Sequence, residues 1–266
     1  MLKTIEPGKR EAVARIFEGL NFGYIADAIL EGQLGAVLAD DEVCPSVGIL
    51  EMRFGDEFMF AILGGDANHP VAPECVERVS PAAEVWTLSP EWVELIRLAH
   101  GERVLDGTRR LLGSKRLDRE HLKAITARVP ADCRLVPLDL AWATRLAEEQ
   151  SQFAQSHGVN YTSPSDFVDR GFGWLLLRDK EILSIASTFA VSSKGIEIQI
   201  NTRDAHRRSG YGKITGAALT LDALERGLDP CWDASNEGSA SLARSLGYTP
   251  HRTLKTLIVE SSPQEG

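Results

Sequence analysis

The segment NTRDAHRRSGYGK, Asn201 to Lys213, decides how the rest of the sequence is interpreted. It places four basic side chains beside one carboxylate and contains two glycines two positions apart. A strand-like segment, GIEIQINT, leads into it, and an amphipathic helical pattern runs from Ile214 to Leu224 after it. The start of a helix exposes unpaired N–H groups and partial positive charge. The order of strand, basic glycine loop and helix therefore predicts a phosphate site.

The residue types of the loop suit a pyrophosphate. Gly210 and Gly212 lack Cβ atoms, so the turn can take a positive φ and a ligand can approach the backbone closely. Arg207, Arg208 and Lys213 add positive charge for phosphate oxygens. An ordinary solvated turn is the alternative when the glycines and basic residues are considered without the flanking strand and helix.

Two other phosphate motifs fit less well. A Walker loop requires Gly at position 207 and Ser or Thr at 214, where this chain has Arg207 and Ile214. A dinucleotide fingerprint requires a third small residue at Thr215 and an early strand-helix unit, which the sequence lacks.

Composition limits the class of protein. The chain has 266 residues, 43% of them hydrophobic, and a net charge of −9, which predicts a folded protein of two domains and disfavours nucleic acid as a partner. The sequence contains no apolar run of membrane-spanning length and no signal peptide, so we expect a cytoplasmic protein with no membrane partner. Cysteine and histidine residues show no metal-ligand spacing, so we expect no metal.

The C-terminal half shows a regular succession of elements. The pattern predicts a helix over 141–154, three strands within 173–202 joined by turns at 179–180 and 193–195, and a long helix that ends at Gly227. A short strand, LDPCWDA, a helix, EGSASLARSLG, and a last strand, LKTLIVE, follow.

The N-terminal half runs through a similar order of helices and strands. We interpret this as a degenerate tandem repeat with a polar joining segment near 116–128. The predicted domains are residues 1–125 and 126–266.

Several motifs together resemble a known family. Arg207-x-x-Gly210-x-Gly212 matches the [Q/R]-x-x-G-x-[G/A] signature of the GNAT N-acyltransferases, and WDASNEGSASLARSLGY resembles the next strand and helix of that family. The combination, over about residues 170–260, is most similar to the branch containing the zwittermicin-A resistance acetyltransferase. The resemblance implies an α+β GNAT fold, a mixed and mostly antiparallel sheet flanked by helices, as a tandem of two GNAT-like halves. The N-terminal half would lack the coenzyme loop, since LGGDANHP stands in its place.

The resemblance also implies acetyl-coenzyme A as co-substrate. The backbone of the strand before the loop would pair with the pantetheine arm, the loop would take the pyrophosphate, and the Asn near the next helix start would contact the pantetheine end. The implied coenzyme-binding residues are Ile200, Asn201, Thr202, Arg207, Arg208, Ser209, Gly210, Tyr211, Gly212, Lys213, Asn236 and Ser239. Helix capping is the alternative role of Asn236 and Ser239.

Two carboxylates are candidates for the base that takes the amine proton. Glu197 lies on the strand before the loop and Asp233 on the following strand. Their alternatives are a solvated surface glutamate and a turn-forming aspartate. The family's usual acid, a tyrosine, is replaced by Ala243. Tyr211, Tyr248, His157 and Tyr161 are further polar groups that could approach the acceptor or only pack.

We expect an N-acetyltransferase that acts on a primary amine of a small molecule, an antibiotic or a metabolite. The alternatives are a non-catalytic acyl-coenzyme A binding protein and a protein or peptide N-acetyltransferase. The sequence leaves the acceptor, the acyl chain and the choice between monomer and homodimer open.

Overall fold

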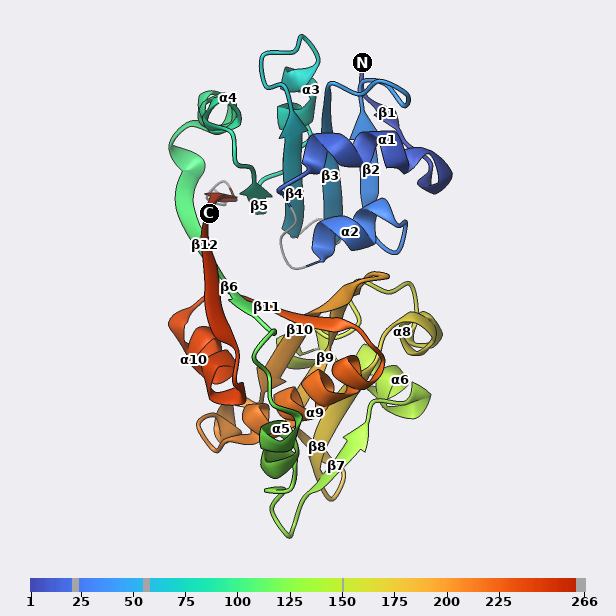
Figure 1. Ribbon diagram of the computed structural model, residues 1–266, viewed down its shortest axis with the longest axis vertical. Coiled ribbons are helices and arrows are strands. Elements are labelled where there is room, and N and C mark those ends of the chain that lie inside the picture. The colour runs from blue at the N-terminus through green and yellow to red at the C-terminus, as the bar shows by residue number, and fades with distance from the viewer. Residues whose placement is uncertain (21–23, 55–57, 150, 262–266) are drawn as a thin grey trace, which may run out of the picture. The chain divides into compact units, whose positions relative to one another are not determined.

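The computed structural model describes residues 1–20, 24–54, 58–149 and 151–261. They form two compact packing units (Figure 1). Unit 1 contains Met1–Arg109 and Thr253–Gly266, and unit 2 contains Arg110–Arg252.

The sheet of unit 1 is mixed. Its strands, in spatial order, are β1 (Lys3–Thr4), β2 (Ala36–Ala39), β3 (Val47–Phe54), β4 (Phe58–Gly65), β5 (Ala83–Trp86) and the C-terminal end of β12 (Thr249–Val259). Neighbours pair antiparallel except β4 and β5, which are parallel. A parallel pair needs a crossover, and α3 (Ala72–Glu77) lies within it.

Helices cover both faces of this sheet. Helices α1 (Arg10–Ala14) and α2 (Ile25–Leu30) lie on the near face of β2 to β4 in Figure 1. On the other face, α3 and α4 (Pro90–His100) pack over apolar strand residues such as Met59 and Leu63. The short 3-10 helices η1 (Pro7–Lys9), η2 (Arg15–Phe17) and η3 (Gly101–Arg103) complete the unit.

The sheet of unit 2 has the same plan. Its strands, in spatial order, are β7 (Arg134–Pro137), β8 (Gly173–Arg178), β9 (Glu181–Val191), β10 (Gly195–Thr202), β11 (Asp229–Ala234) and the end of β6 (Val104–Gly113). All neighbours pair antiparallel except β10 and β11, which are parallel. The predicted strands, and the turns at 179–180 and 193–195, are confirmed.

Helix α9 (Tyr211–Glu225) crosses one face of this sheet, in front of β8 and β9 in Figure 1. The sequence predicted one apolar face, but α9 is buried around most of its circumference. The reason is that α5 (Arg119–Thr126) and α10 (Glu237–Leu246) pack on its other side. Helices α6 (Leu140–Glu148), α7 (Gln152–Gln155) and α8 (Pro164–Arg170) belong to the opposite face, where Leu175 and Ile185 are buried.

The two units repeat one topology and exchange their last strands. In each unit four antiparallel strands are followed by a helical crossover, a parallel strand and a final antiparallel strand. The final strand of unit 1 is β12, which the C-terminal end of the chain supplies, and that of unit 2 is β6. The packing units therefore differ from the predicted domains 1–125 and 126–266. Helix α5, expected as a linker, packs on α9 within unit 2.

The predicted helix over 141–154 is interrupted. Helix α6 ends at Glu148, and the side chain of Ser151 accepts a hydrogen bond from Ala154 N at 3.2 Å, which starts α7 as a separate helix. The carboxylate of Glu149, in the break, binds Arg203 at the end of β10. A contact between two residues that are distant in sequence therefore accompanies the interruption of the helix.

The strand exchange predicts that a residue of β6 stabilises unit 2. Leu112 is 3% exposed and packs with Trp232 and Tyr248. We expect Leu112→Ala to lower the free energy of unfolding by about 2–5 kcal/mol and to speed hydrogen exchange in β11 and α10. Leu105→Ala, on the same strand but 44% exposed, should cost less than about 1 kcal/mol. Equal effects of the two variants would contradict the assignment of this strand.

Candidate active site

The connection between β10 and α9, which contains η4 (Asp204–His206), has the geometry of an anion-binding loop. Arg208 and Gly210 adopt left-handed conformations, with φ of 65° and 82°. Left-handed residues in such a loop turn N–H groups toward one side and form a concave nest. No side chain caps α9, and its first turn contains no acidic residue. Because the first N–H groups of a helix have no carbonyl inside it, they can bind a ligand.

The basic side chains of this loop are accessible. Arg207 and Arg208 are exposed and Lys213 is half-buried. Arg207 forms one ion pair, from Nη2 to Asp204 Oδ1 at 2.7 Å, between two exposed side chains. Such a pair is worth less than about 1 kcal/mol, so a phosphate can replace the aspartate.

The two glycines of the motif have different roles. A Cβ at Gly210 would meet no atom within 4 Å, so this side of the loop is open. A Cβ at Gly212 would lie 3.1 Å from Thr202 Oγ1, so this glycine lets α9 begin close to β10.

Arg203, by contrast, is a structural residue. Its Nη2 binds both carboxylate oxygens of Glu149 at 2.9 Å, and its Nε donates to Ile182 O at 2.7 Å. Its guanidinium also lies 4.4 Å from the ring centroid of Phe153. These contacts hold the α6–α7 connection against the end of β10.

Strand β10 has an open edge. It pairs with β11 only through Gly195–Glu197, and β11 then pairs with β6 instead. The N–H of Arg203 donates to Leu183 O, so by the alternation of antiparallel strands the backbone of Asn201 faces β9. The backbone groups of Ile200 and Thr202 face the open edge. The N–H of Asn201 is thus directed away from the open edge, and coenzyme contact by Asn201 stays a prediction.

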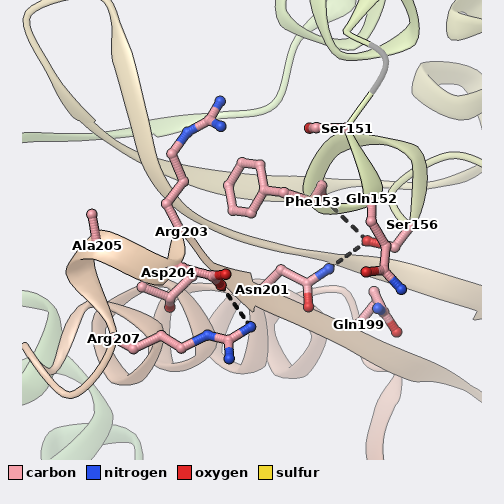
Figure 2. Close-up of a pocket in the computed structure, with 11 residues that line it drawn as sticks. Ser151, Gln152, Phe153, Ser156, Gln199, Asn201, Arg203, Asp204, Ala205 and Arg207 are labelled. Carbon is pink, nitrogen blue, oxygen red and sulfur yellow. Dashed lines mark hydrogen bonds and ion pairs between the residues drawn. The ribbon is translucent and has the colours of Figure 1, made fainter.

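A cavity of about 670 Å³ lies on the face of β10 opposite α9 (Figure 2). It is lined by Ser151, Gln152, Phe153, Ser156, Gln199, Asn201, Thr202, Arg203, Asp204, Ala205 and Arg207. The Asn201 side chain points toward Ser156 and donates to its Oγ, which ties β10 to the end of α7. The lining consists mainly of amides and hydroxyls, with two arginines and one aspartate.

The two candidate carboxylate residues meet where β10 and β11 separate. Glu197 is the last residue of β10 paired with β11, and it is 4% exposed. Its Oε1 accepts a hydrogen bond from Asp233 N at 3.1 Å. The alternative of a solvated surface glutamate is therefore wrong.

Asn236 and Ser239 have structural roles in α10. Asn236 Oδ1 accepts from Ser239 N at 2.9 Å and caps the helix, and its Nδ2 donates to Ser235 Oγ at 3.3 Å. Ser239 Oγ accepts from Trp232 Nε1 at 3.0 Å. The capping alternative is thus observed, and coenzyme contact by these two residues stays a prediction.

Other contacts hold three further positions that were singled out in the sequence. The hydroxyl of Tyr211 accepts from Arg178 Nη2 at 3.1 Å. Tyr248 is buried, with its hydroxyl 3.1 Å from Thr220 Oγ1, and burial raises its pKa well above the usual value. Ala243 is fully buried beside Trp232.

His157 and Tyr161 are buried on the cavity side of the sheet. His157 Nδ1 lies 2.6 Å from Ser187 Oγ, and burial lowers its pKa to about 3. Burial raises the pKa of Tyr161 to about 12, and its hydroxyl lies 2.9 Å from Thr188 Oγ1. His157 is therefore neutral near pH 7 and cannot act there as a base that accepts a stable proton.

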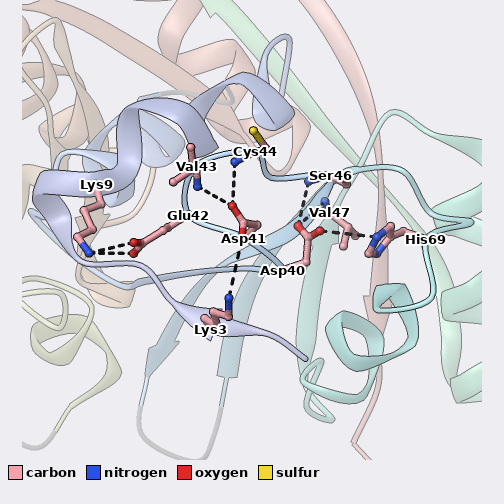
Figure 3. A network of polar contacts seen from close by, with 10 residues as sticks. All are labelled: Lys3, Lys9, Asp40, Asp41, Glu42, Val43, Cys44, Ser46, Val47 and His69. Atoms are coloured by element: carbon pink, nitrogen blue, oxygen red, sulfur yellow. Dashed lines mark hydrogen bonds and ion pairs between the residues drawn. The ribbon is translucent and has the colours of Figure 1, made fainter.

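The corresponding connection of unit 1, between β4 and α3, lacks the anion site. It contains no Lys or Arg from Gly64 to Glu77, and Asp66 Oδ1 accepts from Asn68 N at 2.9 Å. His69 Nε2 lies 3.7 Å from Asp40 Oδ2 (Figure 3). Burial opposes ionisation of Asp40, but hydrogen bonds from Val47 N and Ser46 N outweigh it and lower its pKa. Negative charge at this place disfavours an anionic ligand, and the absence of coenzyme binding by LGGDANHP stays a prediction.

Neither a metal cluster nor a membrane span is found in the described part of the chain. Within residues 1–20, 24–54, 58–149 and 151–261, no group of three or more His, Cys, Asp or Glu side chains could hold a metal ion. None of the helices formed by these residues has the length and apolar character needed to cross a bilayer.

The wall of the cavity that α7 contributes was not predicted from the sequence. Phe153, Ser156 and Gln199 were not singled out, because their proximity depends on the interruption after α6 and on pairing of distant strands. A serine at position 151 was the available signal, since serine favours a helix N-cap.

Comparison with known proteins places these features in one family. Residues 14–257 match the family model for GNAT acetyltransferase. The uncharacterized N-acetyltransferase YdfB of Bacillus subtilis strain 168 is 27% identical over 90 residues, which cover 33% of this chain and 34% of that protein. The matched segment thus spans about a third of that relative.

Solved structures match over nearly the whole chain. A GCN5-related N-acetyltransferase-like protein from Streptococcus suis 89/1591 has a TM-score of 0.80 and 26% identity, covering 94% of this chain and 98% of that one. A tandem GNAT protein from the clavulanic acid biosynthesis pathway has a TM-score of 0.63 and 11% identity, covering 100% and 99%. These matches confirm the predicted fold, including the tandem arrangement.

The low pKa of His157 predicts a pH dependence of stability. Below about pH 6.5 the unfolded chain gains a proton at this histidine and the folded chain does not. Stability should therefore fall between about pH 6.5 and the folded pKa of about 3. In chemical denaturation at several pH values, His157→Gln should flatten this dependence by up to about 1.4 kcal/mol per pH unit. The exposed His251 provides the control, since His251→Gln should leave the slope as in wild type.

Proposed function

The chain belongs to the GNAT acetyltransferase family, and we propose that it transfers an acetyl group from acetyl-coenzyme A directly to a primary amine of a small molecule. The observation that carries this proposal is the open edge of β10, which leads straight into the nest and the uncapped start of α9.

The chain's own residues fit the donor along this path. The N–H groups at the start of α9, with Arg207, Arg208 and Lys213, would bind the diphosphate. The open-edge backbone groups of Ile200 and Thr202 would pair with the amide-bearing pantetheine arm as an added strand does. Asn236 and Ser239, beyond their roles in α10, are the proposed neighbours of the thiol end.

Acetyl-coenzyme A supplies a thioester carbonyl. In direct transfer the amine nitrogen forms the new C–N bond, the C–S bond breaks, and the thiolate takes a proton from water. A carboxylate at the separation of β10 and β11, Glu197 or Asp233, takes the amine proton directly or through water. Backbone N–H groups of the open edge polarise the carbonyl.

The cavity beside β10 is the proposed acceptor site. Its volume of about 670 Å³ suits a small molecule. An antibiotic acceptor, as in the zwittermicin-A resistance branch, and a metabolite are both included in this proposal. Peptide or protein amines are the alternative acceptors. We further propose a cytoplasmic protein, acting as a monomer or a homodimer without nucleic acid or membrane.

A second candidate function is non-catalytic binding of acyl-coenzyme A. Two observations favour it: Ala243 occupies the place of the family's usual acid, and Glu197 is buried in a hydrogen bond to the backbone. A protein that only binds acyl-coenzyme A needs the anion-binding nest, but it needs neither a general acid nor a general base.

A donor assay separates the two functions. Purified protein is incubated with acetyl-coenzyme A and a panel of small amines, aminated antibiotics and peptides, and thiol release is measured with product mass. Acetylation of a small amine supports the main proposal, and acetylation of peptides alone supports the alternative acceptor. Tight coenzyme binding without any product favours the non-catalytic function, and absence of coenzyme binding rejects both.

The glycine at the start of α9 provides a matched pair of variants. Gly210 and Gly227 flank the same helix, both have positive φ, 82° and 77°, and both have open space where a Cβ would lie. We expect Gly210→Ala to raise the Kd for acetyl-coenzyme A at least about tenfold, because the methyl group occupies the ligand's side of the loop.

Gly227→Ala introduces the same backbone strain, about 1 kcal/mol, but should leave this Kd unchanged in calorimetric titration. Undiminished affinity in a folded Gly210→Ala protein would contradict the placement of the diphosphate.

A further inference from the structure

The separation of β10 and β11 is bridged by a side chain. The two strands pair through three residues each, Gly195–Glu197 with Asp229–Cys231. From Trp232 onward β11 pairs with β6. Asp233 N–H, two residues past the last paired position on β11, points back toward β10 and donates to Glu197 Oε1 at 3.1 Å.

In a continued ladder, a backbone carbonyl of β10 would accept that N–H bond. Here the Glu197 carboxylate accepts the bond in place of that carbonyl. A glutamate side chain extends further from its own strand than a backbone carbonyl does. It connects the strands where they have already begun to diverge.

The burial of Glu197 fits this bridging role better than it fits the role of a solvent-exposed base. A carboxylate that is 4% exposed loses most of its hydration, and hydrogen bonds from the protein must offset that cost. A backbone N–H donor to a carboxylate is one of the stronger bonds of this kind. The carboxylate of Asp233, half-buried on the diverging strand, remains at the same place as a candidate base.

We propose that Glu197 is a positioning residue that sets the separation of β10 and β11 through its bond to Asp233 N, rather than the base of the reaction. This inference rests on the proposed function, since the two strands that the bond holds at a fixed distance are the strands proposed to bind the coenzyme. The open-edge groups of Ile200 and Thr202 lie on one strand, and Asp233 lies on the other. The bond from Asp233 N to Glu197 Oε1 links these two strands.

Three variants test the proposal. Glu197→Gln keeps an acceptor oxygen but removes the basic carboxylate, and Glu197→Met keeps the size but removes the acceptor. Asp233→Asn keeps the backbone N–H and removes the other carboxylate. The readouts are the Kd for acetyl-coenzyme A, kcat and KM for the acceptor amine, and the hydrogen-exchange rate of the Asp233 amide, each on protein shown by circular dichroism to be folded.

Glu197→Gln should raise the Kd less than Glu197→Met does and lower kcat less than Asp233→Asn does, because its amide oxygen can still accept the Asp233 N–H bond. Glu197→Met should raise the Kd about tenfold or more, as expected for loss of a hydrogen bond to a charged group. It should also speed exchange of the Asp233 amide. Asp233→Asn should leave the Kd unchanged and lower kcat about a hundredfold or more, the usual contribution of a general base.

Two results would overturn the proposal. One is a Glu197→Met protein with wild-type Kd and unchanged exchange at Asp233. The other is a Glu197→Gln protein that loses kcat as fully as Glu197→Met while both retain coenzyme affinity, which would make Glu197 the base. If Glu197→Met does not fold, the Glu197→Gln result decides. A wild-type protein that does not bind acetyl-coenzyme A would reject the proposed function instead, independently of these comparisons.

Discussion

The candidate site depends on the early end of pairing between β10 and β11. The strands separate after Glu197 and Cys231, because β11 continues along β6. The separation leaves one edge of β10 open just before the anion-binding loop. Peptide groups at an open edge can bind an extended, amide-bearing ligand, and the positive end of a helix can bind its phosphates. If β10 were paired with β11 along its whole length, only the N-terminal end of α9 would remain available to such a ligand.

The two units place different residues on the same kind of connection. Both contain a parallel strand reached through a helix, and thus the same kind of connection. In unit 2 that connection carries arginines and leads into a helix of 15 residues. In unit 1 it carries Asp66 and leads into a helix of 6 residues, too short for a useful dipole. The difference between the two connections therefore arises from local sequence rather than from the fold.

Much of unit 2 could be predicted from the sequence, because its signals are local. Gly227 and Gly247 end α9 and α10 with positive φ, and the alternation of apolar residues located β8 to β10. The interruption after α6 and the burial of Glu197 could not be predicted. The first involves Arg203, some fifty positions further along the chain, and the second involves the backbone of a strand that pairs with β6.

The order of most elements, the nest-forming loop and the family could be predicted from the amino-acid sequence, because they depend on neighbouring residues and their spacing. Which strand completes each sheet is visible only in the folded chain, since β6 and β12 take their partners from distant parts of the chain. The tertiary structure also decided what the polar groups do. A carboxylate or an amide acts according to what lies within hydrogen-bonding distance, and for Glu197 and Asn201 those partners are 36 and 45 positions away.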